Sequence, residues 1–208
     1  MIEDSGEIDA LLRRVRQGDE QSLNEVFQRY RNRLRRMVEM RLDRRLRGRV
    51  DPSDVLQEAF LEAAKRLDQY LSRPSLPLFL WLRFLVGERL LQLYRHHLGT
   101  RARDVRRELT LFGGPMPAAS SAALATQLVA GVISPSQAAV RAERVLRIQQ
   151  ALNAMDPVDR EVLSLRHFEQ LSNSETATEL GIGESASSNR YVRALKRLGA
   201  LLKEPNEL

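Results

Sequence analysis

The sequence feature that most constrains the fold is a long internal stretch without charge. No charged residue occurs from Leu109 to Val140, although charged residues make up 29 % of the 208-residue chain. The stretch is rich in Gly, Pro, Ser and Ala, which is typical of a linker, and its 122–133 portion is apolar enough for a short docked helix. We therefore expect two domains, residues 1–108 and 138–208, joined by a flexible uncharged linker over 109–137.

The spacing of apolar residues predicts that both charged parts are helical. Apolar side chains recur at intervals of three or four, and neither an alternating strand pattern nor an Asn-Gly hairpin turn is present. In the first part we expect helices over 8–15, 22–47, 51–70 and 78–98, with Gly48 closing the second as a C-cap residue. In the second part, helix-start signals precede residues 136, 157, 173 and 184. The predicted fold class is all-α.

Composition narrows the range of possible functions. The net charge is +6 and there is no cysteine, so disulfides, thiol nucleophiles and Cys-based zinc sites are excluded. His96 and His97 are neighbours on a helix without a spaced third ligand, and no phosphate-binding Gly-Lys loop or nucleophile elbow occurs. We expect no enzyme activity, no metal and no cofactor. The acidic N-terminus and the shortness of the longest apolar stretch predict a cytoplasmic protein without membrane insertion.

The clearest functional motif is a helix-turn-helix over Ser172–Lys203. Ser172 and Glu175 have the spacing of a capping box, and Gly181 and Gly183 supply a tight turn before a helix with a net charge of +4. In such a unit the second helix lies in the major groove, where Ser and Asn contact base edges and Arg and Lys contact phosphates or guanine. Core-facing positions are predicted at Tyr191, Ala194, Leu198 and Leu201. The alternative is a solvated face on an ordinary helical hairpin.

The segment MDPVDREVLSLRHFEQLSNSETATELGIGESASSNRYVRALKRL resembles the fourth conserved region of bacterial sigma factors. That resemblance implies binding to the −35 promoter element and to the flap of the polymerase β subunit. This sequence departs from the family where the recognition helix begins, because Ser187 replaces a core valine and Ser188 replaces a basic contact. The residues predicted to contact −35 DNA are Ser185, Ser188, Asn189, Arg190, Arg193, Lys196 and Arg197.

A row of acidic residues marks the helix expected over 51–70. Asp54, Glu58 and Glu62 follow one another at spacings of four, so they repel one another on one face unless a basic partner binds there. A solvated acidic face is the simpler explanation. However, DPSDVLQEAFLEAAKRL resembles the helix of the second conserved sigma region that docks on the coiled coil of the polymerase β′ clamp. By that match the polymerase contacts are Asp54, Gln57, Glu58, Leu61 and Glu62.

The next segment, 71–107, contains the single tryptophan of the chain, Trp81. Its position resembles that of the tryptophan in the promoter-melting segment of the same family, in which the preceding loop captures a flipped base; a lone Trp among leucines is otherwise a core residue. The residues predicted at −10 DNA are Trp81, Arg83, Glu88, Arg89, Gln92, Arg95 and His96. Residues 31–49 carry nine arginines, which predicts either a solvated face or sequence-independent phosphate contacts.

Together the two matched regions cover nearly the whole chain, and the larger sigma factors' third domain is replaced by the linker. The chain is thus identified as resembling the extracytoplasmic-function (ECF) class of sigma factors. The resemblance implies core RNA polymerase and promoter DNA as partners, with an anti-sigma factor as a further candidate. Two alternatives remain: a stand-alone helix-turn-helix regulator that uses its first domain to dimerise, and a helical protein-interaction adaptor.

Overall fold

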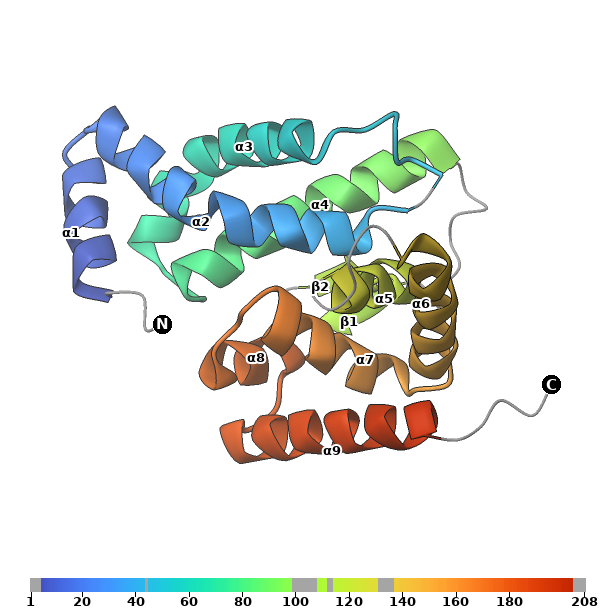
Figure 1. Cartoon of the computed structure of the whole chain (residues 1–208). Helices are drawn as coiled ribbons and strands as arrows, with labels where there is room; N and C mark the ends of the chain where they lie inside the picture. The colour runs from blue at the N-terminus through green and yellow to red at the C-terminus, as the bar shows by residue number, and fades with distance from the viewer. Residues whose placement is uncertain (1–4, 44, 99–107, 112–113, 131–136, 204–208) are drawn as a thin grey trace.

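The computed structural model of the chain describes residues 5–43, 45–98, 108–111, 114–130 and 137–203. Apart from one short hairpin, the described elements are helical, which confirms the all-α prediction. In Figure 1, helices α1–α4 form an upper layer and α7–α9 a lower one, with the hairpin and α5 between them and α6 along one side. The elements are α1 Ser5–Val15, α2 Glu20–Arg41, α3 Pro52–Ser72, α4 Leu78–Leu98, β1 Glu108–Leu111, β2 Gly114–Pro117, α5 Ser121–Ala130, α6 Ala138–Asn153, α7 Pro157–Leu163, α8 Asn173–Leu180 and α9 Glu184–Lys203.

Helices α1–α4 form the first module, and acidic N-caps set where two of them begin. The Asp19 carboxylate accepts hydrogen bonds from the backbone N–H groups of Gln21 and Ser22 at 3.0 and 3.2 Å. Asp51 caps α3 in the same way, accepting from the Ser53 N–H at 2.7 Å. The apolar faces of the four helices share one buried core, to which Leu34, Met37, Val38, Val55, Ala63, Val86 and Leu90 contribute.

Helix α2 ends earlier than its sequence pattern predicts. We expected it to continue to residue 47, but it stops at Arg41, and Leu42 adopts an extended conformation. The reason is local: the Asp43 carboxylate accepts a hydrogen bond from the Arg45 N–H at 2.9 Å and folds the chain into a turn. Gly48, with φ of 89°, lies in the next turn, in which the Arg49 N–H donates to the Leu46 carbonyl oxygen at 2.9 Å, and is not the helix C-cap that we predicted.

The described parts of the linker, 109–111 and 114–130, are mostly folded into a strand pair and a helix. Strands β1 and β2 pair antiparallel with Leu109 opposite Met116, a short hairpin for which the sequence carried no signal. Met116 is buried against α4 where Gly87 lacks a side chain; a Cβ there would lie 2.7 Å from the Met116 sulfur. The helix expected within 122–133 is present as α5, and residues 131–136 lie outside the described part of the chain.

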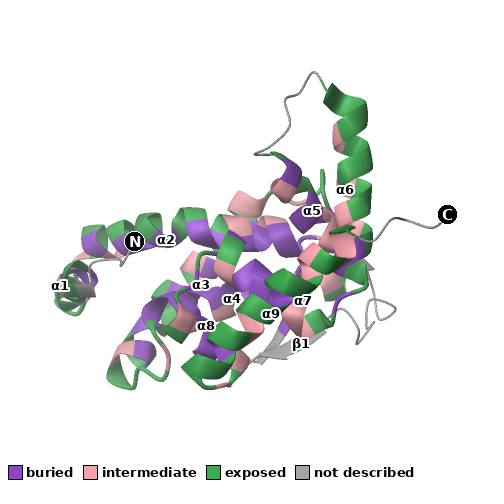
Figure 2. Cartoon of the chain, turned by 60° about the horizontal axis from the view of Figure 1, so that its bottom comes forward, coloured by how far each residue is buried: buried purple, intermediate pink, exposed green. Residues whose placement is uncertain are grey.

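Helices α6–α9 form the second module. A π-helical turn, Ser164–Phe168, follows α7, and in it the Glu169 N–H donates to the Ser164 carbonyl oxygen at 2.9 Å. The apolar faces of α6, α7 and α9 meet at buried Leu152, Leu163 and Ala194. The N-terminal half of α6 projects away from this core with most of its side chains exposed (Figure 2).

An apolar cluster joins the two modules and the linker. Met40 at the end of α2 lies in the same buried cluster as Leu124 of α5 and Leu163 of α7. Beside it the Ser120 N–H donates to the Met40 carbonyl oxygen at 2.8 Å. The linker therefore packs between the modules. Over the described residues, no helix has the length and apolar character needed to cross a bilayer.

Candidate functional site

The predicted helix-turn-helix is formed by α8 and α9. The Ser172 hydroxyl accepts from the Glu175 N–H at 3.1 Å, and the Glu175 carboxylate accepts from the Ser172 N–H at 2.7 Å, which confirms the capping box. Gly181 closes α8 with φ of 64°, a left-handed conformation that favours glycine. These two local features set where α8 begins and where it ends before the longer helix.

Helix α9 presents a polar and basic face to solvent. Tyr191, Leu198 and Leu201 pack against the buried cluster around Ala194, as their spacing predicts. Ser187 is fully buried, in agreement with its assignment to a core position, and its hydroxyl lacks a hydrogen-bond partner among the described residues. Six of the predicted −35 residues are exposed, namely Ser185, Ser188, Asn189, Arg193, Lys196 and Arg197.

The remaining predicted −35 residue, Arg190, is half-buried. Its guanidinium lies 3.0 Å from the Asp159 carboxylate, and this ion pair connects α9 to α7. The sequence reasoning did not single out Val192 and Leu195, which are exposed apolar side chains on the same helix.

The predicted polymerase-binding residues lie on the outer face of α3. Asp54, Gln57, Glu58 and Leu61 are exposed, and the Leu61 side chain is 59 % exposed despite being apolar. Beside them, a groove of about 530 Å³ between α2 and α3 is lined by Phe27, Phe60, Gln57 and Leu61, among others. Phe27 and Phe60 stack at 4.5 Å between ring centroids. The face thus combines carboxylates with an accessible aromatic groove.

Two acidic residues of this face already have partners within the first module. Glu58 forms an ion pair with Arg89 of α4, and half-buried Glu62 pairs with Arg66 at 2.7 Å. Arg66 also reaches Glu88 of α4 at 3.1 Å. These exposed pairs each contribute at most about 1 kcal/mol, so a basic partner can exchange with them at little cost.

A pocket lies where α3, the following loop and the start of α4 meet. Its volume is about 400 Å³, and its wall includes Arg66, Arg73, Ser75 and Trp81. The Trp81 ring is half-buried and stacks on Tyr70 at 4.4 Å, and the Tyr70 hydroxyl donates to the Leu76 carbonyl oxygen at 2.8 Å. Burial raises the pKa of Tyr70, so its hydroxyl stays protonated and keeps donating to the loop.

The other predicted −10 residues do not share one exposed face. Gln92, Arg95 and His96 are exposed, whereas Glu88 and Arg89 are half-buried. Arg89 donates to the Gln92 side chain at 3.1 Å. Arg83 does not lie on the exposed polar face that we predicted, because its side chain is fully buried beneath the second module. The physical reason is the cluster of carboxylates that meets it there.

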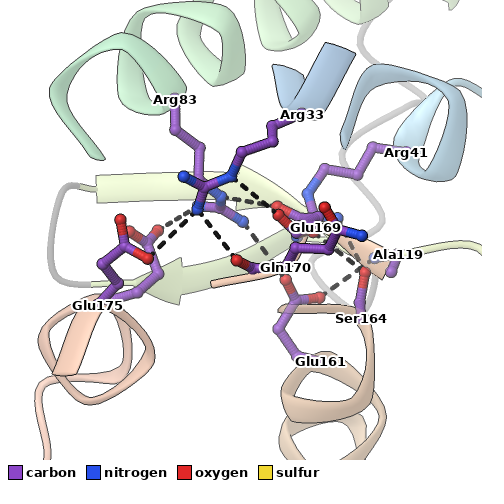
Figure 3. A network of polar contacts seen from close by, with 10 residues as sticks. Arg33, Arg41, Arg83, Ala119, Glu161, Ser164, Glu169, Gln170 and Glu175 are labelled. Carbon is purple, nitrogen blue, oxygen red and sulfur yellow. Dashed lines mark hydrogen bonds and ion pairs between the residues drawn. The ribbon is translucent and has the colours of Figure 1, made fainter. Parts of the chain in front are cut away.

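We refer to seven residues at the contact between the modules as the charge network (Figure 3). Arginines from α2 and α4 point down onto glutamates of the second module. Arg41 and Arg83 reach Glu169 at 2.7 and 2.8 Å, both also contact Glu161, Arg83 pairs with Glu179, and Arg33 lies 3.2 Å from Glu175. The members are Arg33, Arg41, Arg83, Glu161, Glu169, Glu175 and Glu179.

Burial and charge compete within the charge network. Burial by itself would lower the pKa of Arg83, but the carboxylates of Glu169, Glu179 and Glu161 raise it above its ordinary value. Burial would likewise raise the pKa of Glu169, yet Arg41 and Arg83 hold it below the usual carboxyl range. For Glu179 burial outweighs Arg83, and its pKa is raised. Arg83 therefore stays charged and binds Glu169 as a carboxylate.

The arginine-rich stretch 31–49 is thus largely engaged within the protein. Arg33 and Arg41 belong to the charge network, whereas Arg35 and Arg45 pair with neighbouring Glu39 and Asp43 at 2.9 Å. Across the described segments, no group of three or more His, Cys, Asp and Glu side chains is arranged to hold a metal ion.

A helix-turn-helix module with a basic recognition helix, joined to a second helical module, defines a DNA-binding protein built from two units. Two family models match these units: ECF sigma factor over residues 5–81, and Sigma-70, region 4, over residues 146–198. The chain is 30 % identical over 159 residues to the RNA polymerase sigma factor CnrH of Cupriavidus metallidurans, covering 76 % of each protein. It therefore belongs to the ECF sigma factor family, non-enzymatic proteins that direct RNA polymerase to initiate transcription.

Further relatives agree. The RNA polymerase sigma factor NccH of Alcaligenes xylosoxydans xylosoxydans is 29 % identical over 201 residues, 94 % of each chain. The ECF sigma factor SigD of Mycobacterium tuberculosis is 29 % identical over 191 residues, 92 % of this chain and 82 % of SigD. The structure of CnrH in complex with the cytosolic domain of CnrY has a similar fold, with a TM-score of 0.53 at 21 % identity over 93 % of this chain and 95 % of that one. Family membership decides against the stand-alone regulator and the adaptor.

Proposed function

We propose that this sigma factor divides its work among three surfaces: the outer face of α3 binds the polymerase β′ clamp, the pocket at Trp81 handles −10 DNA, and α9 contacts the −35 element. We assign the first two surfaces to region 2, residues 1–108, and the third to region 4, residues 138–208. The observation that carries the proposal is the exposed face of α3, on which Asp54, Glu58 and Leu61 stand beside an open aromatic groove. Apolar side chains exposed in this way mark protein-binding surfaces.

Charge reversal tests the polymerase surface. Glu58→Lys should weaken binding to purified core polymerase at least tenfold, because it places a cation against the basic partner that the acidic row favours. Asp68→Lys is the matched control, since Asp68 is exposed on the same helix about two turns beyond Leu61, the nearest predicted contact on its side of the helix. Binding of an isolated −35 duplex should be the same for both variants. Equal core affinity of the two variants would remove α3 as the docking face.

Fluorescence tests the −10 pocket. Trp81 is the single tryptophan of the chain, so its emission reports on the pocket directly. Labelling the protein with 5-hydroxytryptophan allows position 81 to be excited selectively in the presence of polymerase. We expect this emission to change in a saturable manner when a single-stranded −10 oligonucleotide is added to the polymerase-bound protein. Stacking of a base on an aromatic surface contributes about 1–3 kcal/mol, so Trp81→Ala should weaken oligonucleotide binding roughly tenfold. An unchanged affinity would reject the pocket.

Salt dependence tests the −35 surface. Arg193→Ala and Lys196→Ala should each weaken duplex binding across all sequences and reduce the slope of log affinity against log salt by about 1, if each contacts one phosphate. Changes at Ser188 or Asn189 should instead alter the preferred base, since these exposed side chains suit base-edge contacts. Slopes equal to that of the unmodified protein would contradict the assignment of the two basic residues.

The remaining partners follow from the same assignment. We propose that the second module also contacts the polymerase β flap and that the protein works in the cytoplasm, where polymerase acts. The similarity to CnrH, which was solved with the cytosolic domain of CnrY, supports an anti-sigma partner for this chain as well. The test is run-off transcription by core polymerase plus this protein: a candidate anti-sigma protein should suppress it, and absence of run-off product from its own promoter would reject the activity itself.

A further inference from the structure

Two apolar side chains are exposed on the basic helix α9, and only one of them lies on the side that faces away from the module. Val192 and Leu195 are each 45 % exposed. A single exposed apolar side chain is common on protein surfaces and by itself indicates no function. The direction in which each side chain leaves the helix therefore decides what it can contact.

Helix geometry places Val192 opposite the buried side of α9. Ala194 and Ser187 are both fully buried, so they define the side of the helix that packs against the second module. At about 100° per residue, Val192 points about 160° away from Ala194 and about 140° away from Ser187. Leu195 points only about 100° and about 80° away from the same two residues, so it lies on the flank. In Figure 1, α9 forms the lower edge of the molecule, and no described element covers its far side.

Val192 lies among the residues that we predict at the −35 element. Ser188 and Asn189 precede it by four and three residues, and Lys196 follows it by four, which are the spacings at which side chains share one face of a helix. All three of these neighbours are exposed. A side chain that cannot form hydrogen bonds therefore stands in the middle of the polar face.

Val192 also lies in the part of α9 that suits contact with bases. In helix-turn-helix units the N-terminal part of the second helix meets the base edges. The 20-residue helix begins at Glu184, and Val192 lies about 12 Å along its axis from there. The exposed residues before it on this face, Ser185, Ser188 and Asn189, have short side chains. The helix can therefore approach the floor of the groove closely enough for the van der Waals contact of about 4 Å that an apolar side chain needs.

The chemistry of valine limits what it can recognise in the major groove. Valine neither donates nor accepts a hydrogen bond, and the apolar group by which base pairs differ in this groove is the C5-methyl group of thymine. A valine on a helix also keeps one strongly preferred rotamer, so it loses little conformational freedom when it packs against a methyl group. Its position and its chemistry thus select the same partner.

We propose that Val192 recognises a thymine of the −35 element by packing against its C5-methyl group. The proposal rests on the assignment of α9 to −35 DNA under the proposed function and adds a residue that determines base preference. Burying one methyl group increases affinity about fourfold, so a base pair without that methyl group should bind more weakly by about this factor.

Deoxyuridine tests the contact, because it pairs with adenine as thymidine does but lacks the C5-methyl group. The full-length protein bound to core polymerase is titrated with duplexes of its own promoter, in which the thymines of the −35 element on both strands are replaced one at a time. For the unmodified protein we expect at least one replacement to weaken binding about threefold to fivefold. Val192→Ala should weaken binding to the all-thymine duplex by about the same factor, and that replacement should then have no further effect.

Leu195→Ala is the matched control. Leu195 has the same exposed fraction on the same helix but points to the flank, so its variant should keep the full effect of uridine at every position. Val192→Ala removes an exposed side chain and improves helix propensity, so both variants should retain the helix content of the unmodified protein by circular dichroism.

The outcomes separate the methyl contact from the assignment of α9. If uridine has no effect at any position, or weakens binding of Val192→Ala as much as binding of the unmodified protein, the methyl contact is overturned. A −35 element without thymine on either strand would overturn it as well. If Arg193→Ala and Lys196→Ala still weaken duplex binding in those cases, α9 remains the −35 surface and only the contact of Val192 is lost. If neither changes duplex binding, the assignment of α9 fails and the proposal fails with it.

Discussion

Replacing Ser187 with valine should stabilise the second module. Ser187 is fully buried at the start of α9, and its hydroxyl finds no hydrogen-bond partner within the described segments of the chain. Leaving a buried hydroxyl unpaired costs about 1–3 kcal/mol, and each additional buried methyl group contributes about 0.8 kcal/mol. Serine and valine have similar helix propensities, so that difference is negligible.

The opposing effect is crowding. Extra methyl groups in a packed core cost about 1–3 kcal/mol where neighbours cannot move aside. Ser187→Ala separates the two effects, because it removes the hydroxyl without adding volume. We expect the free energy of unfolding to rise by about 1 kcal/mol in the alanine variant and by about 1–2 kcal/mol in the valine variant. For a cooperative unit of 150–250 residues, 1 kcal/mol corresponds to about 2–4 °C in Tm.

The assay is urea and thermal unfolding followed by far-ultraviolet circular dichroism. Ser188→Val is the matched control, since Ser188 is the exposed neighbour on the same helix and should change stability by no more than about 0.5 kcal/mol. An unchanged or lower stability of Ser187→Ala would refute the reasoning, because it would mean that the hydroxyl is satisfied. If the alanine variant is more stable and the valine variant less stable than the unmodified protein, the core around position 187 has no room for the valine methyl groups.

Three further changes test local features. Ser172→Ala should lower the free energy of unfolding by about 1 kcal/mol in a urea titration, since it removes half of the capping box; an unchanged midpoint would contradict this. Hydrogen bonds from the backbone and side chain of Ser53 lower the pKa of Asp51, so its stabilisation is present above the ordinary carboxyl pKa and is lost as pH falls through the lowered one. In Asp51→Asn, Tm should therefore depend less on pH below about pH 5, and an identical pH profile would rule the cap out. Gly87→Ala should stabilise by about 1 kcal/mol in a Met116→Ala background, through helix propensity, but less in the native background, where the new Cβ meets Met116; additive effects in the double-mutant cycle would oppose that contact.

Features set by a few neighbouring residues were predicted well from the sequence. The starts of α3 and α8 follow from Asp51 and Ser172, whose side chains cap the backbone within three residues. The helix-turn-helix could be predicted for the same reason, because its cap and its glycine turn are both local signals. Ser187 was recognised as a core position, and the structure buries it.

Features set by distant residues were not predicted. Arg83 resembled an outward-facing residue on a polar stripe, but its partners Glu169 and Glu179 lie 86 and 96 positions further along the chain. Helix periodicity describes one helix and carries no information about which face another domain will cover. The hairpin was missed similarly, since its four-residue strands are too short to show alternation and Met116 gains its burial from α4.

Leu124 of the linker packs with Met40 and Leu163 of the two modules. Both the length of the linker and its side chains are therefore constrained. The linker must be long enough for the modules to reach both promoter elements, whereas its side chains must fit the space between the modules. A linker of unchanged length made only of glycine and serine would meet the first constraint and lose the second. In such a chain the charge network would still connect the two modules, but the apolar contact that Leu124 makes with Met40 and Leu163 would be lost.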